Sequence, residues 1–262
     1  MALIKKFFFI MLLGTISVII NGCSDKVTEK PHFIQYNASF YAEKDSEYPL
    51  SISYLNTRNS KSVIKPENVT SIQFGKDKLV KIKNYKFYES NPSKKYSISN
   101  IELNLSFPEI GKEEVHELTI NFTKGNPITF PIGNWIFNIE PESSNKEFLE
   151  MGKDYGVVFP KFDGYRLNFY NKSNEKISIS DVKIQLKSVE FEKSNYTINP
   201  KTTLKTINKI KGKPASDMFF IIRPKIEYKL NDQNYSYYPY ASLYGNIEIT
   251  DEDLEREFNK TS

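Results

Sequence analysis

Few residues in this chain of 262 could perform covalent or metal chemistry, because it contains one Cys and two His. His116 lies among carboxylates, with Glu114 before it and Glu117 after it, so it could act as a general base or as a metal ligand. The other histidine, His32, is distant in the sequence, and the strand expected around His116 follows a glycine turn. We therefore predict that His116 is a surface residue and that the chain holds no metal and no cofactor.

The chain lacks the sequence motifs that usually accompany acyl transfer and nucleotide binding. The chain has no Gly-x-Ser-x-Gly turn, no Gly-x-x-x-x-Gly-Lys loop and no dinucleotide fingerprint. The closest carboxylates, at 113–114 and 251–253, fall in an expected turn and in a tail, whereas glycosidase acids are usually buried to raise a pKa. The sequence therefore predicts no catalytic residues and favours a protein that is not an enzyme.

The single cysteine, Cys23, follows a hydrophobic N-terminal segment. Lys5 and Lys6 precede the uncharged residues 7–20, whose length suits the core of a signal peptide. A membrane-spanning helix needs about 20 residues. The segment ends in Ile-Asn-Gly-Cys at 20–23, which resembles the lipobox of bacterial lipoproteins: an aliphatic residue, a tolerated residue, a small residue and then Cys.

The lipobox resemblance implies that Cys23 receives a diacylglyceryl group and that cleavage follows Gly22. Each buried CH₂ contributes about 0.8 kcal/mol, so two or more acyl chains would hold the protein stably at the extracytoplasmic face of the cell membrane. Two alternatives stay open: an ordinary cleaved signal peptide that leaves a free thiol, and an uncleaved helical anchor.

The chain after Cys23 has the composition of a globular β protein. Hydrophobic residues at 39% and aromatic residues at 14% supply a core, and a net charge of +4 does not indicate nucleic acid as a partner. Segments of β-branched and aromatic residues recur about every ten residues, separated by Asn, Gly, Pro and Ser. These segments predict an all-β fold.

A polar stretch at 142–154 interrupts the strand pattern and is interpreted as a linker. Segments 48–54 and 165–170 resemble each other, since each begins with Tyr and leads through an Asn/Ser turn to another strand. We therefore predict two tandem Ig-like β-sandwiches of about 100 residues each; one large sandwich is the alternative. The expected order is a signal peptide (1–22), a lipidated tether (23–32), a first sandwich (33–141), the linker (142–154), a second sandwich (155–250) and an acidic C-terminal tail (251–262).

Two groups of side chains in the second half could form a binding surface. The segment from Lys193 to Lys213 contains six basic residues and no acid, together with Pro200 and Gly212, so it is predicted to be a long loop. Its candidate binding residues are Lys201, Lys205, Lys209, Lys211 and Lys213. The second group comprises the tyrosines of the last expected hairpin, Tyr235, Tyr237, Tyr238, Tyr240 and Tyr244. The alternatives are a solvated loop and ordinary strand tyrosines.

These features predict a membrane-anchored extracytoplasmic lipoprotein that acts as a non-catalytic binding or scaffolding module at the bacterial cell envelope. The expected partners are the membrane, through Cys23, and an envelope protein or an anionic envelope polymer. Lysines near a charged surface contribute about 1 kcal/mol each, and exposed tyrosines suit protein or sugar ligands. An envelope enzyme with an unrecognised active site is the alternative function.

Overall fold

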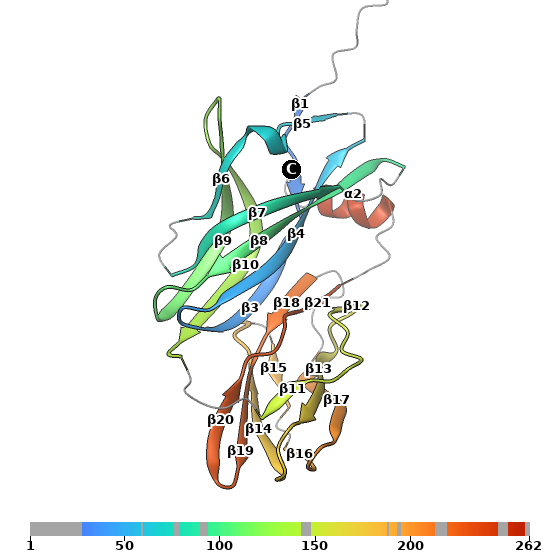
Figure 1. Cartoon of the computed structure of the whole chain (residues 1–262). Coiled ribbons are helices and arrows are strands. Elements are labelled where there is room, and N and C mark those ends of the chain that lie inside the picture. The colour runs from blue at the N-terminus through green and yellow to red at the C-terminus, as the bar shows by residue number, and fades with distance from the viewer. Residues whose placement is uncertain are drawn as a thin grey trace, which may run out of the picture.

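The computed structural model describes residues 28–58, 60–75, 79–89, 94–142, 148–187, 189–192, 195–212, 219–245 and 251–259. These residues form two tandem β-sandwiches, one above the other in Figure 1, so the predicted all-β fold is confirmed. In the part of the chain that is described, no helix combines the length and the apolar character that crossing a membrane requires.

The first sandwich encloses an aromatic core between two sheets. One sheet has the order β2-β4-β8-β7, with bounds His32–Phe33, Glu47–Thr57, Tyr96–Ser106 and Lys81–Glu89. The facing strands, in spatial order, are β3 (Tyr36–Glu43), β10 (Ile128–Glu140), β9 (Gly111–Phe122) and β6 (Val69–Phe74). The ring of the buried Trp135 lies 6.1, 5.9 and 6.2 Å from those of Phe40, Phe74 and Phe137, because alternate residues of a strand share one face.

A short arm covers the upper end of this sandwich. Its β5 (Lys61–Ser62) pairs in parallel with β1 (Thr28–Glu29), and the 3₁₀ helix η1 (Pro66–Asn68) leads from it into β6. Strand β1 falls within the segment expected to be a tether. The chain therefore enters the fold beside this arm (Figure 1).

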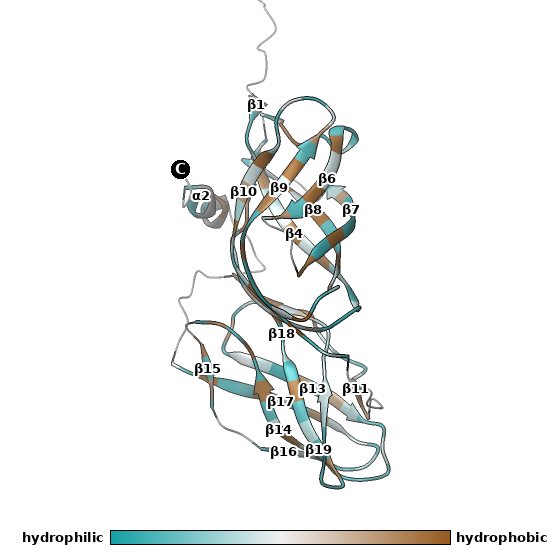
Figure 2. Cartoon of the chain, turned by 90° about the vertical axis from the view of Figure 1, so that its left-hand side faces the viewer, coloured by the Kyte–Doolittle hydropathy of each residue, from teal (hydrophilic) through white to brown (hydrophobic). Residues whose placement is uncertain are grey.

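The second sandwich has a core of its own. One sheet contains β11 (Leu149–Met151), β13 (Gly164–Asn171), β17 (Thr203–Lys211) and β15 (Glu190–Phe191) in that order. The other contains β16 (Tyr196–Ile198), β14 (Ile177–Lys183), β19 (Lys225–Leu230) and β20 (Gln233–Tyr237). Their inward residues, among them Tyr165, Phe169 and Tyr228, are buried between the sheets. Figure 2 shows the strands of this sandwich below those of the first.

One hairpin joins the two sandwiches. Pro224 separates β18 (Phe219–Arg223) from β19, and Pro239 lies between β20 and β21 (Ser242–Tyr244). Proline has no N–H for a sheet ladder, so both strands leave the second sandwich at these points. Beyond them β18 pairs with β3 of the first sandwich and β21 pairs with β18. Strand β12 (Val158–Phe159) adds to β21, and the result is one seven-stranded sheet.

The prediction of a long loop between Lys193 and Lys213 is wrong. Most of that segment forms β16 and β17, and β17 pairs along its length with β13. Leu204, Asn208 and Ile210 turn inward while the lysines alternate with them on the exposed face. The sequence of this segment does alternate between inward and outward residues, but its high lysine content makes the alternation hard to recognise.

The C-terminal segment returns to the first sandwich. Residues Asp251–Asn259 of the expected acidic tail form helix α2. Leu254 is buried there with Leu55 of β4 and Tyr96 of β8, on the outer face of their sheet. Lys95 and Glu255 form an ion pair at 2.9 Å beside this contact.

Candidate functional site

The sequence-predicted lysines form an exposed row on β17, with Lys201 in the preceding turn. Lys205 pairs with Asp154 at 2.6 Å, and Lys211 pairs with Glu190 at 3.0 Å. Lys201 donates to the carbonyl of Lys172 at 2.5 Å. Acids from neighbouring segments therefore offset much of the positive charge of this row. Lys193, Lys213 and Cys23 lie outside the described residues.

The predicted tyrosine patch does not gather on one surface. Tyr237 and Tyr244 are buried, and Tyr235 stacks on Tyr228 with 5.4 Å between ring centroids. Tyr238 donates to Glu140 at 2.8 Å where the two sandwiches meet. Tyr240 alone among these five is well exposed, at 61%. The alternation of β20 and β21 sends most of the rings inward.

His116 is exposed on β9, as predicted, and lines a shallow hollow of about 390 Å³ with Gln35, Asn37 and Asn134. The described residues contain no cluster of three or more His, Cys, Asp or Glu side chains that could hold a metal ion.

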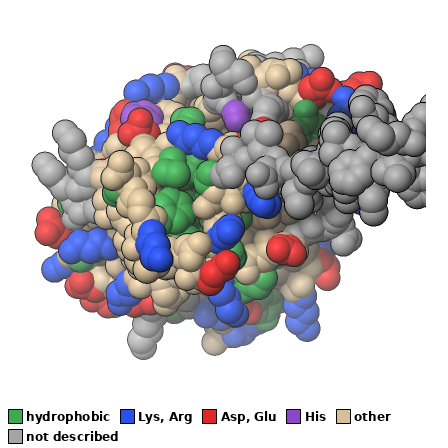
Figure 3. Space-filling view, turned by 90° about the horizontal axis from the view of Figure 1, so that it is seen from above, with side chains coloured by type: hydrophobic (Ala, Val, Ile, Leu, Met, Phe, Trp, Pro, Cys, Tyr) green, Lys and Arg blue, Asp and Glu red, His purple; other side chains and the backbone are tan. Residues whose placement is uncertain are grey.

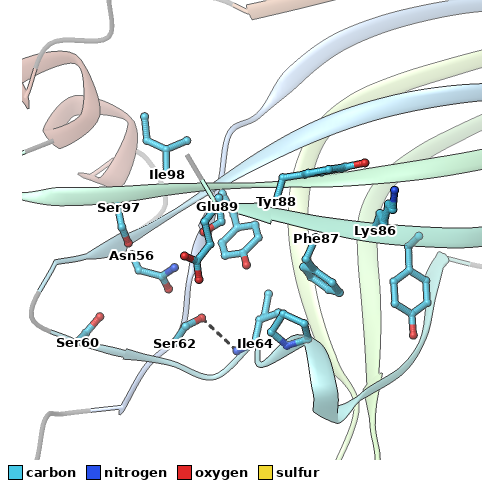
Figure 4. A pocket seen from close by; sticks show the side chains of 14 residues that line it. Asn56, Ser60, Ser62, Ile64, Lys86, Phe87, Tyr88, Glu89, Ser97 and Ile98 are labelled. Atoms are coloured by element: carbon cyan, nitrogen blue, oxygen red, sulfur yellow. Dashed lines mark hydrogen bonds between the residues drawn. The ribbon is translucent and has the colours of Figure 1, made fainter. Parts of the chain in front are cut away.

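A larger groove, of about 670 Å³, lies at the upper end of the first sandwich. Its floor is the inner face of the β4-β8-β7 sheet, and its roof is the arm from Ser60 to Pro66 (Figure 4). Figure 3 looks down on this end of the molecule, where hydrophobic side chains lie among charged ones. We call this site the arm groove.

The floor of the arm groove is polar where the inner face of a sandwich is usually apolar. Lower down, Leu50 pairs with Leu103, and Ile52 pairs with Ile101. Further along the same face, Tyr54 pairs with Ser99 and Asn56 with Ser97. On the outer face the same end of the sheet is apolar instead, because Leu55 and the neighbouring Ile98 pack against Leu254 of α2.

Asn56 is the chemically distinctive residue of the arm groove. Its side chain is only 4% exposed, yet its Oδ1 has no hydrogen-bond partner. A buried amide without a partner costs free energy, and such groups are rare in native structures. Asn56 points into the space between β4 and the arm, together with Ser62 and Glu89 (Figure 4).

Three other buried side-chain oxygens of the described residues lack partners, on Asn134, Asn168 and Gln185. The Asn168 oxygen packs against Gly152 so closely that a Cβ there would lie 2.0 Å away, so no ligand fits between them. Asn134 is only half-buried and lines the shallow hollow beside His116. Asn56 is therefore the one of the four that is both more than nine-tenths buried and part of the large groove.

The walls of the arm groove are held by local hydrogen bonds. The Tyr85 hydroxyl donates to the carbonyl of Val69 at 3.0 Å and so links the edges of the two sheets. Ser62 Oγ accepts from the Ile64 N–H at 3.1 Å, which shapes the arm (Figure 4). The Thr57 hydroxyl donates to Glu29 at 2.5 Å and ties β1 to the end of β4.

The Glu89 carboxylate faces the arm groove from β7. Burial raises the pKa of the Tyr54 hydroxyl, a hydrogen bond with Ser99 opposes that shift, and the Glu89 carboxylate adds to it. Lys86 and Tyr88 lie on the outer face of this sheet, where the Lys86 ammonium is 5.6 Å from the centre of the Tyr88 ring. The groove thus offers amide and hydroxyl groups, aromatic rings and one carboxylate, an arrangement that suits binding.

Sequence reasoning did not identify the arm groove, although β8 carries a signal for it. Ser97, Ser99 and Ile101 lie on one face with Leu103 and Leu105, so the apolar pattern of the inner face stops at Ile101. The arm itself carries no comparable sequence signal.

No protein-family model matches the chain, and no curated protein matches it. Among solved structures, the non-cellulosomal cohesin of the archaeon Archaeoglobus fulgidus is similar at 11% identity, with 43% of this chain and 92% of that chain covered and a TM-score of 0.20. A Porphyromonas gingivalis W83 protein of unknown function shares 11% identity over 82% and 99% of the two chains, with a TM-score of 0.22.

The D00-D0 domain of intimin shares 7% identity over 82% of this chain and 98% of that chain, with a TM-score of 0.23. These three TM-scores are too low to support an argument. The strand pairings themselves define the fold.

Proposed function

We propose that this protein is a lipid-anchored, extracytoplasmic, non-catalytic binding module of the bacterial cell envelope, and that it binds its ligand in the arm groove. One observation carries the choice of site: a buried amide oxygen without a partner, on Asn56, in the largest groove described above. A ligand that donates a hydrogen bond to this oxygen would remove the cost of burying it.

The anchor part of the proposal is supported by the sequence around Cys23. Thr28, the first residue of β1, is the fifth residue after Cys23. At about 3.5 Å per residue, the chain from Cys23 to Thr28 spans at most about 18 Å. Lipidation of Cys23 would therefore keep β1, and the arm that pairs with it, close to the membrane surface.

Metabolic labelling with a radioactive fatty acid tests the anchor. We expect the wild-type protein to be labelled and Cys23→Ala to lose the label and to accumulate as precursor or released protein. Equal labelling of the two proteins would contradict the anchor.

Crosslinking in the native envelope, followed by mass spectrometry, tests the binding site. We expect the wild type to capture a recurrent partner or polymer and Asn56→Leu to capture much less of it. Asn234→Leu, the same substitution at an exposed asparagine of β20, is the control and should behave as wild type. Equal capture by all three proteins would contradict the arm groove as the binding site.

A further inference from the structure

We infer that the arm groove binds uncharged sugar residues of a glycan held close to the membrane. The inference rests on the proposed function and adds the chemical class of the ligand. It follows from three properties of the groove: its hydrogen-bonding groups, its aromatic walls and its place beside the N-terminal segment.

The hydrogen-bonding groups of the arm groove match a ligand that can both donate and accept hydrogen bonds. Asn56 Oδ1 and the Glu89 carboxylate can only accept, whereas the hydroxyls of Ser97 and Ser99 can do either. A sugar hydroxyl donates one hydrogen bond and accepts others, so a single kind of group satisfies the whole floor. An anionic ligand would instead place its charge against Asn56 Oδ1 and Glu89.

The aromatic walls suit the apolar faces of sugar rings. Tyr85 and Phe87 come from the edge strand β7 and lie on the same inner face of the sheet as the polar floor, opposite Leu103 and Ile101. The rings of Tyr85 and Phe87 lie 5.8 Å apart at an angle of 78°. Large rigid rings give contact area at low entropic cost, while the polar groups on β4 and β8 orient the ligand.

The place of the arm groove favours a glycan at the membrane surface. Strand β1 pairs directly with β5, which forms part of the groove's roof. With Cys23 acylated, the short segment before Thr28 would hold Thr28, beside this roof, within about 18 Å of the bilayer. Sugars carried on lipid headgroups lie within that range.

The test uses the mature chain from Ser24, which contains every described strand and has no acyl chains of its own. It is titrated with neutral hexasaccharides of glucose, galactose and N-acetylglucosamine. It is also mixed with vesicles of digalactosyldiacylglycerol or of phosphatidylglycerol, in parallel for wild type, Asn56→Leu and the Asn234→Leu control. Thermal unfolding of each protein is recorded with the binding.

We expect saturable binding to the digalactosyl vesicles, and binding about tenfold weaker for Asn56→Leu, as the loss of one buried hydrogen bond gives. Asn234→Leu should bind as wild type. Asn56→Leu should also unfold at the wild-type temperature or above it, because the apolar side chain removes an unpaired polar group of similar size. A strongly lowered unfolding temperature would mean that Asn56 serves the fold, and would overturn the inference.

The remaining outcomes separate the ligand class from the proposed function. If no sugar probe binds while capture from the envelope still depends on Asn56, the sugar inference is wrong and the binding site stands. If capture does not depend on Asn56, both are wrong. Binding to phosphatidylglycerol vesicles alone would indicate that the lysines of β17 are the binding residues. Equal binding of free sugar and of lipid-linked sugar would contradict the inference that the bound glycan is held at the membrane.

Discussion

The two ends of the first sandwich differ in how their buried polar groups are hydrogen-bonded. At the lower end, against the second sandwich, the Tyr48 hydroxyl accepts from the Ala241 N–H at 2.6 Å. Arg223 donates to the carbonyls of Pro239 and Tyr41 at 3.1 and 3.0 Å, and one oxygen of Gln185 stays unpaired there. At the upper end, Asn56 Oδ1 is buried beside the arm groove without a partner.

This difference separates polar groups that hold the fold together from those available to a ligand. Arg223 and Tyr48 connect β3 and β4 to the hairpin shared by the two sandwiches, so their hydrogen bonds are part of the fold. Asn56 contributes no such bond through its oxygen. Stability measurements should therefore separate the two ends.

The largest contrast is expected within one strand, β8. Ile101→Ala removes a fully buried side chain from the apolar part of the inner face and should lower the free energy of unfolding by about 3–4 kcal/mol. Ser99→Ala, on the same face beneath the arm groove, should cost about 1 kcal/mol or less. Urea denaturation of both variants checks this, and similar losses would mean that the groove floor is ordinary core.

Arg223→Met tests the closed lower end. It removes two hydrogen bonds to carbonyls and the contact of the guanidinium with the Tyr48 ring, whose centre lies 4.6 Å away. We expect a loss of about 2–3 kcal/mol in the free energy of unfolding, because both carbonyls lose a charged donor. A change below about 0.5 kcal/mol, as for a surface substitution, would contradict a structural role for Arg223.

The lysine row on β17 should matter much less for stability. Lys205→Met and Lys211→Met each break one exposed ion pair, so the unfolding midpoint should stay within error of wild type. Charge reversal at Lys201, Lys205 and Lys209 should weaken binding to an anionic envelope polymer at low salt, and the effect should vanish at high salt. Unchanged binding at low salt would remove the row as a binding surface.

The smallest effect concerns His32, which pairs in register with Leu55 beside the arm groove. Burial lowers the pKa of His32, and Glu29 partly opposes this shift. The folded state therefore binds fewer protons than the unfolded state around the ordinary histidine pKa of 6.5. Stability should fall as pH drops from about 7.5 through that value, and His32→Gln should lose less over the same range. Parallel slopes for the two proteins would show that His32 does not contribute.

Much of the strand content could be predicted from the sequence, because alternation of apolar and polar residues is a local pattern. Segments such as Ser99–Phe107 could be assigned to a strand without knowledge of the partner strand. The lysine-rich segment was assigned wrongly because Lys205, Lys209 and Lys211 conceal an alternation that only the pairing with β13 makes plain.

The candidate binding residues could not be predicted in the same way. Exposure of a tyrosine depends on which face of its strand meets a sheet, and the charge of a lysine row depends on acids brought near it by folding. Tyr237 and Tyr244 are buried for the first reason, and Lys205 meets Asp154 for the second. Neither relation is a property of neighbouring residues in the chain.

The sequence by itself determined the fold class, through periodic strands and a large aromatic content, and it singled out Cys23 as the predicted anchor. Only the tertiary structure decided that one hairpin joins the two sandwiches and that Asn56 is buried without a partner. The physical reason is that burial and hydrogen-bond pairing depend on distant segments. Asn56 is enclosed by Ser62 of the arm, Ser97 of β8 and Glu89 of β7, and α2 covers the opposite face of the same strand.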